Sequence, residues 1–311
     1  MMMEQTATTS PDPELDEAVE AEVNGDMLET PPHLVDVIIP TWNNEAYLRP
    51  CLETFWQTVP LQLAHVWVVN NGAPDSCSWI TAPNTTILEV GENLGWEGGL
   101  EIGLRYATAP AVLFLNDDVH FPPSSNGWLE RLLGHFEDER VGAVGPLSNM
   151  VVGAQNMFLT HLHPLTEARF LIGFCMLVWR EALDEVGGIS HGLPGGDDFD
   201  LSLRLRNAGY LMVADRREFV YHHAYKTGER VHGPSSIPGG WNSKSQTDAT
   251  VAALVERYGQ ATWDHLFAFP DEYVPLILED EADEGAFDAA TGMDMDMDMG
   301  MDADEQESSA G

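Results

Sequence analysis

Residues 113–123 read LFLNDDVHFPP, and the interpretation of the whole chain starts from this stretch. An apolar segment ends at Asn116, and two carboxylates, Asp117 and Asp118, follow it side by side. Adjacent like charges cost free energy unless a cation lies between them or solvent screens them. The pair therefore raises the question of whether a cation binds at the end of this strand or solvent screens the two charges. The simpler alternative is a turn that leads into the N-cap of a helix near FPPSSNGW.

Three similar apolar segments precede this one, and each is rich in β-branched residues and ends at a polar residue or proline. The four segments are VDVIIP (35–40), HVWVVN (65–70), TTILEV (85–90) and AVLFLN (111–116). Such runs are typical of buried parallel strands. Stretches with helical spacing follow the first, third and fourth runs, at 45–57, 98–109 and 126–139. We expect Pro50 to delay or kink the first of these helices.

This alternation predicts an α/β fold with a mainly parallel open sheet flanked by helices, as in Rossmann-like folds. Ligands of such sheets bind outside the carboxyl ends of the strands. Further along, the sequence predicts a helix at 195–209 and an amphipathic stretch at 248–259, separated by YLMVADRREFVYHH (210–223). The Gly- and Pro-rich segment 225–242 is a candidate lid, or else a plain surface loop. The length of 311 residues fits one large domain or two fused units.

The chain is strongly acidic, with 51 Asp and Glu against 14 Lys and Arg and a formal net charge of −37. All 14 basic residues lie between Arg49 and Arg257, and only Lys226 and Lys244 are lysines. This balance argues against a nucleic-acid binder and against docking on anionic lipid. Molar salt screens the self-repulsion of such a chain, so we interpret the composition as resembling that of extreme halophiles. An ordinary protein with two acidic tails is the alternative.

Both ends of the chain carry acid and no base, with 9 acidic residues in 1–33 and 15 in 271–311. Their composition, including the tract MDMDMDMGMDADEQESSAG, predicts disorder. Three widely spaced cysteines, Cys51, Cys77 and Cys175, match no metal-binding spacing and indicate reduced thiols. No signal peptide and no apolar run of about 18 residues is present, so we expect a cytoplasmic protein, at most peripheral at the inner face of a membrane.

Each predicted strand delivers polar residues to the same edge of the sheet. The first ends in Pro40, Thr41, Trp42 and Asn43; the second leads to Asn70, Asn71, Gly72 and Asp75; the third leads to GENLGWEGG; the fourth gives Asn116, Asp117 and Asp118. Each group alone is typical of a turn. Their recurrence at one edge indicates a binding site.

The order of these motifs resembles the family 2 glycosyltransferases with the GT-A fold, especially the rhamnosyltransferase-like members. VDVIIPTWN is similar to the family's V-x-V-I-I-P-T-Y-N, VVNNGAPD to V-V-D-N-G-S-x-D, and NLGWEGGLEIG to N-x-G-x-x-G-G-x-N-x-G. Asn116-Asp117-Asp118 matches the metal motif N-x-D or D-D-D, and GDDFDLSLR matches G-E-D-x-D-L-x-x-R. A histidine segment follows at His222 and His223. The resemblance covers about residues 35–260.

The resemblance implies a nucleotide-diphospho-sugar transferase domain at 34–270, with a nucleotide-binding half at 34–120 and an acceptor-binding half at 121–270. It implies that the nucleotide sugar is bound by Pro40, Thr41, Asn43, Asn71, Asp75, Asn93, Gly95, Gly98 and Asp117. Trp42, Trp96, Tyr225 and Trp241 are candidates for stacking on a sugar or base, although such residues more often pack in the core. Three departures stand out: Asn70 replaces an Asp that contacts the base, Glu101 replaces an Asn, and Asp197 replaces a Glu.

The resemblance also implies a divalent cation held by Asp118, Asp117 and a histidine. Carboxylates with one imidazole suit Mg²⁺ or Mn²⁺, and Mn²⁺ accepts nitrogen more readily. By motif position His222 is preferred to His223, while an ordinary histidine at the end of a strand is the alternative.

Asp197 and Asp198 open the helix at 195–209, where we expect the helix dipole to keep carboxylates ionised. An ionised carboxylate near the acceptor can take the proton of the attacking hydroxyl. Asp198 is the predicted base, and Asp197 is either the alternative base or an acceptor-binding group. Helix capping is the competing explanation. For Asp200 and Arg204, four residues apart, we expect only a structural ion pair.

These features predict a metal-dependent glycosyltransferase that moves a sugar from a nucleoside diphosphate sugar to an acceptor hydroxyl, with inversion of the anomeric centre. The acceptor could be a glycan, a lipid-linked precursor or a polysaccharide, and the oligomeric state is left open. Two alternatives are a non-catalytic sugar-nucleotide-binding module and a metal-dependent nucleotidyltransferase or hydrolase.

Overall fold

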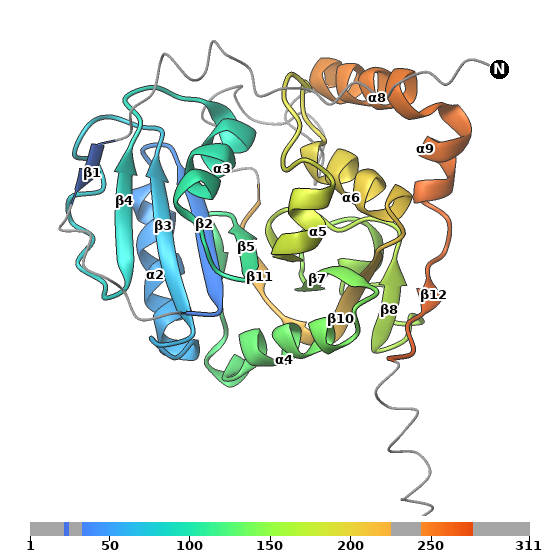
Figure 1. The fold of residues 1–311 in the computed structure, drawn as a ribbon, viewed down its shortest axis with the longest axis horizontal. Coiled ribbons are helices and arrows are strands. Elements are labelled where there is room, and N and C mark those ends of the chain that lie inside the picture. The colour runs from blue at the N-terminus through green and yellow to red at the C-terminus, as the bar shows by residue number, and fades with distance from the viewer. Residues whose placement is uncertain (1–21, 25–32, 225–243, 276–311) are drawn as a thin grey trace, which may run out of the picture. The chain divides into compact units, whose positions relative to one another are not determined.

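The computed structural model describes residues 22–24, 33–224 and 244–275. Within these residues the chain forms a ten-stranded mixed sheet of order β1-β4-β3-β2-β5-β9-β7-β10-β8-β12, and a separate two-stranded ribbon pairs β6 with β11 (Figure 1). Four adjacent strands are parallel: β4 (Thr85–Glu89), β3 (Ala64–Asn70), β2 (Val35–Thr41) and β5 (Ala111–Leu115). Their carboxyl ends therefore meet at one edge, as the sequence predicts.

The second half of the sheet is mixed. β9 (Cys175–Trp179) runs antiparallel to both β5 and β7 (Val141–Leu147), and β10 (Leu211–Phe219) runs parallel to β7. β8 (Leu165–Ala168) and β12 (Asp271–Glu272) complete the edge in antiparallel pairs. Seven of the ten described strands of this sheet thus run in one direction, which confirms the mainly parallel α/β fold.

Helices cover both faces of the sheet, and the alternation of side chains along each strand decides which face each residue joins. On one face, α2 (Glu45–Thr58) and α4 (Trp128–Gly134) pack on residues such as Val37 and Val66. On the other, α3 (Gly95–Tyr106), α5 (Arg180–Glu185) and α6 (Asp197–Asn207) pack on residues such as Ile38 and Trp67. A third cluster joins α6 to α8 (Lys244–Tyr258) and α9 (Gln260–Leu266).

A short antiparallel ribbon brings the histidine segment to the acidic motif. β6 (Val119–His120) follows Asp118 directly, and it pairs with β11 (Tyr221–His222) so that His222 lies opposite Val119. Residues separated by about a hundred positions in the chain are therefore placed side by side. This pairing is what makes a combined Asp118 and His222 site possible.

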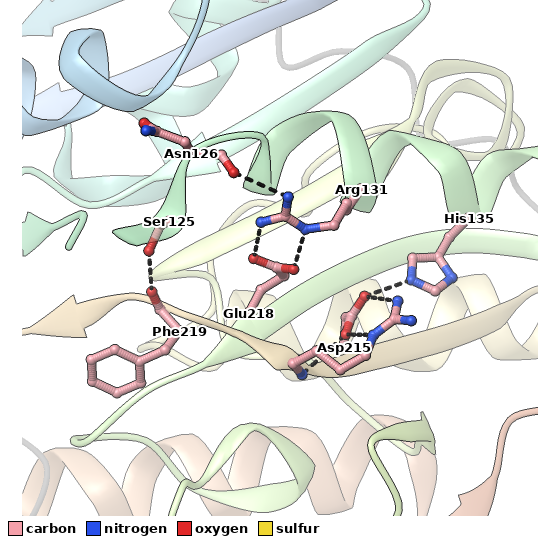
Figure 2. A network of polar contacts seen from close by, with 8 residues as sticks. Ser125, Asn126, Arg131, His135, Asp215, Glu218 and Phe219 are labelled. Carbon is pink, nitrogen blue, oxygen red and sulfur yellow. Dashed lines mark hydrogen bonds and ion pairs between the residues drawn. The ribbon is translucent and has the colours of Figure 1, made fainter. Parts of the chain in front are cut away.

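Buried acids with cationic partners tie the second half together. Asp215 on β10 accepts hydrogen bonds from Arg217 and lies 2.9 Å from His135 Nε2, and Glu218 binds the guanidinium of Arg131 through both oxygens (Figure 2). These contacts fasten α4 and the short 3₁₀ turn after it to β10. Asp138 is held in the same way by Arg140.

The observed elements correct the sequence expectations in three places. α2 begins at Glu45, ahead of Pro50 rather than late, because Asn44 O accepts the N–H groups of Tyr47 and Leu48 and starts the helix. Residues 22–24, inside the segment expected to be disordered, form β1 antiparallel to β4. The structure also describes residues 271–275, past the expected domain limit at 270, and Tyr273 is buried and donates to Asp138.

The three cysteines are free and buried, in keeping with the expected reduced thiols. Among the residues that the structure describes, no helix is both long enough and apolar enough to cross a membrane.

Candidate active site

The loops after β2 and β3 interlock at the carboxyl edge of the sheet. Asn43 Oδ1 accepts the N–H of Ala73, and Asn43 has a left-handed φ of 50°, which asparagine tolerates better than most residues. A Cβ on Gly72 would lie 2.6 Å from Asn43 Oδ1, so only glycine fits between the two loops. Asn71 donates to the carbonyl of Gly95 and so connects both loops to the start of α3.

Asp117 is buried and points inward. Its Oδ2 accepts the hydroxyl of Thr41 at 2.7 Å, and its Oδ1 accepts the amide of Asn44 at 2.9 Å. Both oxygens are thus committed to the loop after β2. Asp117 is thus hydrogen-bonded to Thr41 and Asn44, whereas Asp118 faces the histidine segment.

Asp118 and His222 form a close pair, with 3.2 Å between Asp118 Oδ1 and His222 Nε2. His222 Nδ1 lies 3.2 Å from the carbonyl of Met150, which can only accept, so neutral His222 carries its proton on Nδ1 and turns the Nε2 lone pair toward Asp118. The ring also stacks on Phe174 at 5.1 Å between centroids. His223 lies elsewhere, with its ring against His120 and Tyr47.

This donor set fits a divalent cation that completes its shell with substrate oxygens. Two ligands at right angles around an ion, with bonds of about 2.1–2.2 Å, lie about 3.0 Å apart, close to the observed separation. Within the described residues, no three His, Cys, Asp or Glu side chains gather closely enough to hold a metal ion by themselves. Phosphate oxygens and water would therefore supply the other ligands, as is usual for Mg²⁺ in phosphate sites.

Asp198 lies at the start of α6, whose N-cap Gly196 has a left-handed φ of 82°. Its Oδ2 accepts the N–H of Gly173 at 3.1 Å and its Oδ1 accepts the N–H of Phe199 at 2.9 Å. Burial, with the charge of Asp197 beside it, raises the pKa of Asp198 to about 6. Burial thus outweighs the helix dipole and the two N–H groups in setting this pKa, although a pKa of about 6 still leaves Asp198 mostly ionised at neutral pH.

Asp197 is 9% exposed and faces Glu97 in the first turn of α3. Burial raises the pKa of Asp197 well above its usual range, and the hydrogen bond to Glu97 and the charge of Glu97 raise it further. Asp197 Oδ1 is buried and has no hydrogen-bond partner in the part of the chain that the structure describes.

The other predicted binding residues line the same edge in different ways. Pro40 packs closely on α3, because a Cβ on Gly99 would lie 2.7 Å from Pro40 Cβ. Asn93 caps Gly95 N–H with its side chain, and Gly95 has a positive φ of 74° that starts the helix. Gly98 makes room for Leu94 of its own helix rather than for a ligand. Asp75 lies on the exposed tip of the loop after β3.

Two departures from the family pattern have structural partners. Asn70 is buried, donates to Glu89 at 2.7 Å and accepts the N–H of Gly72, so its amide holds the loop after β3. A carboxylate at this position would repel Glu89. Glu101 lies 3.2 Å from His191 and 3.8 Å from Arg105.

Asp200 is structural, as the sequence indicates. Arg204 donates to it at 2.8 Å, and Arg257 and Tyr258 of α8 donate to its other oxygen. The i,i+4 pair is thus confirmed, and the two partners from α8 extend it into a link between helices.

Sequence reasoning missed three residues that the structure brings into the site, and it named a fourth, Asn116, without giving it a role of its own. Asn44 holds Asp117, Asn116 faces His222 with its amide at 3.3 Å, Gly173 holds Asp198, and Glu97 faces Asp197. A signal was available for Asn44, the polar residue just before a helix, and for Asn116, the first residue of the acidic motif. Gly173 and Glu97 depend on tertiary contacts. Tyr225, Trp241 and the candidate lid 225–242 lie outside the described residues.

The fold and the edge of polar residues define a class of protein, the GT-A type of α/β fold, in which acids at the end of a central strand face a histidine segment. The model of glycosyl transferase family 2 matches residues 36–187, and this part of the chain is a family 2 glycosyltransferase domain. The matched range includes Asp117, Asp118 and Gly173. It ends before Asp197, Asp198 and His222, so the roles of these three rest on geometry.

Relatives and a solved structure agree with this assignment. An uncharacterized protein of Mycobacterium bovis is 30% identical over 166 residues, which cover 47% of this chain and 62% of the relative. The pre-mycofactocin glycosyltransferase of Mycobacterium tuberculosis is 28% identical over 194 residues, 56% of this chain and 39% of that protein. The chain thus matches less than two thirds of either relative.

The mannosyltransferase PcManGT of Pyrobaculum calidifontis, solved in complex with GDP-Man and Mn²⁺, has a similar fold, with a TM-score of 0.53 and 18% identity. The match covers 76% of this chain and 79% of that one. At this identity the similarity establishes the fold.

Proposed function

We propose that this protein is a metal-dependent, inverting glycosyltransferase that moves a sugar from a nucleoside diphosphate sugar to an acceptor hydroxyl. The observation that carries the proposal is the arrangement of two unlike acid sites at one edge of the sheet. Asp118 faces the lone pair of His222 at 3.2 Å, while Asp198 is held by two backbone N–H groups at the start of α6. The first site suits a cation and its phosphates, and the second suits proton transfer.

Asp198 takes the proton of the acceptor hydroxyl as the hydroxyl oxygen attacks the anomeric carbon. The bond from that carbon to the diphosphate oxygen breaks, and the nucleoside diphosphate leaves with the electron pair. A single displacement of this kind inverts the anomeric centre. A pKa of about 6 keeps Asp198 mostly ionised near neutral pH while leaving it basic enough to accept a proton.

Asp118 and His222 would hold a Mn²⁺ or Mg²⁺ ion, and the imidazole nitrogen favours Mn²⁺. Such an ion supplies positive charge that stabilises the departing diphosphate. Asp117, fixed by Thr41 and Asn44, shapes the loop beside it. Loops carrying Asn43, Asn71 and Asp75 would line the nucleotide pocket.

The acceptor that we propose is a hydroxyl of a glycan, a lipid-linked precursor or a polysaccharide. The relative from Mycobacterium tuberculosis is named for a different, pre-mycofactocin acceptor, and the low coverage of that protein leaves the acceptor of this chain open. The acidic composition further suggests work in high salt, so the assays belong in molar KCl.

The test is a screen of nucleotide sugars with Mn²⁺ or Mg²⁺, with donor binding followed by calorimetry and donor turnover by release of the nucleoside diphosphate. We expect Asp118→Asn to weaken cation-dependent donor binding by about 10–100-fold. Asp198→Asn should keep donor binding and lower turnover by about 10²–10⁴-fold. Asp184→Asn, an exposed acid on α5, is the matched control.

Two results would contradict the proposal. Release of pyrophosphate instead of a nucleoside diphosphate would indicate a nucleotidyltransferase. Donor binding without turnover in the unsubstituted protein, whatever acceptor is offered, would indicate a binding module.

A further inference from the structure

Trp96 connects the two acid sites. It is the second residue of α3, and its indole N–H donates to Asn116 Oδ1 at 3.1 Å. Asn116 is the residue between β5 and the Asp117-Asp118 pair. Because indole can only donate, this bond fixes the orientation of the Asn116 amide and turns its NH₂ group toward His222 Nε2, 3.3 Å away.

The ring of Trp96 also touches the loop that holds Asp198. A Cβ on Gly173 would lie 2.5 Å from Trp96 Cζ2 and 2.7 Å from Cη2, so the ring occupies the space that a side chain at 173 would need. Gly173 N–H is one of the two donors to Asp198. The ring of Phe114 meets Trp96 edge-on at 6.3 Å between centroids and supports it from the strand below.

The next residue, Phe174, connects this loop to the Asp118 and His222 site. Phe174 O accepts the N–H of Asn116, and the Phe174 ring stacks on His222. The segment 173–174 therefore contacts both sites, and Trp96 packs against it and bonds to Asn116 at the same time. Two discrete contacts of one side chain set the separation of Asp198 from the pair Asp118 and His222.

We propose that Trp96 is a positioning residue for sugar transfer, which holds the proton acceptor Asp198 and the diphosphate-binding pair Asp118 and His222 at the separation that the reaction requires. This inference rests on the proposed function. It assigns Trp96 to the framework between the sites instead of to stacking on a sugar or base. A displacement of about 1 Å between reacting groups can lower a rate by about 10²-fold, so the effect belongs in the chemical step.

Trp96→Phe keeps an aromatic ring and removes the N–H donor and part of the ring surface. We expect turnover of a nucleotide sugar to fall by about 10–100-fold, while calorimetry finds the donor dissociation constant with Mn²⁺ unchanged within about threefold. Trp56→Phe is the matched control, because Trp56 Nε1 donates to Thr85 Oγ1 at 3.2 Å from a similarly half-buried position on α2. The control should lose stability and keep its turnover.

A second variant approaches the same contact from the other side. Gly173→Ala displaces the Trp96 ring, and it should lower turnover with donor binding retained; combined with Trp96→Phe it should cost less than the product of the two single effects. This variant provides the test if Trp96→Phe does not fold.

The proposal is overturned if both Trp96→Phe and Gly173→Ala turn over donor as Trp56→Phe does. It is equally overturned if either variant loses donor binding in step with turnover, which would place Trp96 on the ligand. In both cases the unsubstituted protein remains active, whereas an unsubstituted protein that turns over no nucleotide sugar contradicts the proposed function itself.

Discussion

Asp138 before β7 and Asp215 on β10 behave in the opposite way to Asp197 and Asp198 at the start of α6, although all four lie wholly or partly out of solvent. Asp215 and Asp138 each accept hydrogen bonds from an arginine, and these bonds hold their pKa values below the usual range despite burial. Asp197 and Asp198 have no arginine, lysine or histidine partner among the described residues, and burial raises their pKa values. The same residue type thus has a lowered pKa beside an arginine in one place and a raised pKa without a cationic partner in the other.

The difference shows how the chain distributes its few cations. With 14 Lys and Arg against 51 acids, most carboxylates have no cation to pair with. Arg131 of α4 binds Glu218 of β10, as Figure 2 shows, whereas Arg140 and Arg217 pair with Asp138 and Asp215, each two residues away in the chain. The acids at the helix starts are left to repel one another, which costs stability and gives a group able to accept a proton.

Replacing an anchor gives the largest expected change in stability. Asp215→Asn removes a carboxylate that binds Arg217 and His135 in the sheet, and we expect the free energy of unfolding to fall by about 2–3 kcal/mol. Chemical denaturation at neutral pH measures it, with Asp184→Asn as the surface control. If Asp215→Asn is as stable as the control, Asp215 does not anchor the fold, and the contrast between arginine-paired acids and the acids at the start of α6 no longer holds.

The pH dependence of sugar transfer tests the acids at the start of α6. Asp198 accepts a proton only when it is ionised, and its pKa of about 6 lies above the ordinary value of 3.8. The rate should therefore be nearly constant at neutral pH and fall as pH decreases through about 6, approaching tenfold for each further pH unit. The measurement is kcat/KM against pH at constant salt. A profile that stays flat down to pH 4 contradicts this environment for the base.

The smallest expected effect concerns the neighbour of the base. Asp197→Asn removes a negative charge that raises the pKa of Asp198, so the acidic limb of the rate profile should move to lower pH. An acid whose pKa is raised on folding destabilises the folded state as pH rises through that pKa, so the same variant should gain about 1 kcal/mol at neutral pH. Rate profiles and thermal unfolding measure the two effects. Loss of transfer in Asp197→Asn, with transfer retained in Asp198→Asn, would instead make Asp197 the base.

The strands and the polar residues at their ends could be predicted from the sequence because a buried parallel strand has a recognisable local sequence pattern. VDVIIP, HVWVVN and AVLFLN are continuous runs of β-branched and apolar residues, and Asn116, Asp117 and Asp118 follow directly on the chain. Pairing of such strands brings their ends together, so the edge of the site follows from local pattern and the rule for parallel sheets. The choice of His222 over His223 as the metal ligand followed from motif position and stays a prediction.

Only the tertiary structure decided the direction and the pKa of each acid in the site. Asp117 turns inward because Thr41 and Asn44 donate hydrogen bonds to it. The pKa of Asp198 is raised because burial outweighs the N–H groups of Gly173 and Phe199, and Glu97 meets Asp197 from a helix a hundred residues away. The reason is physical. Sequence specifies which residues carry charge, but a carboxylate's pKa and direction depend on its burial and on partners that only the packed chain brings near.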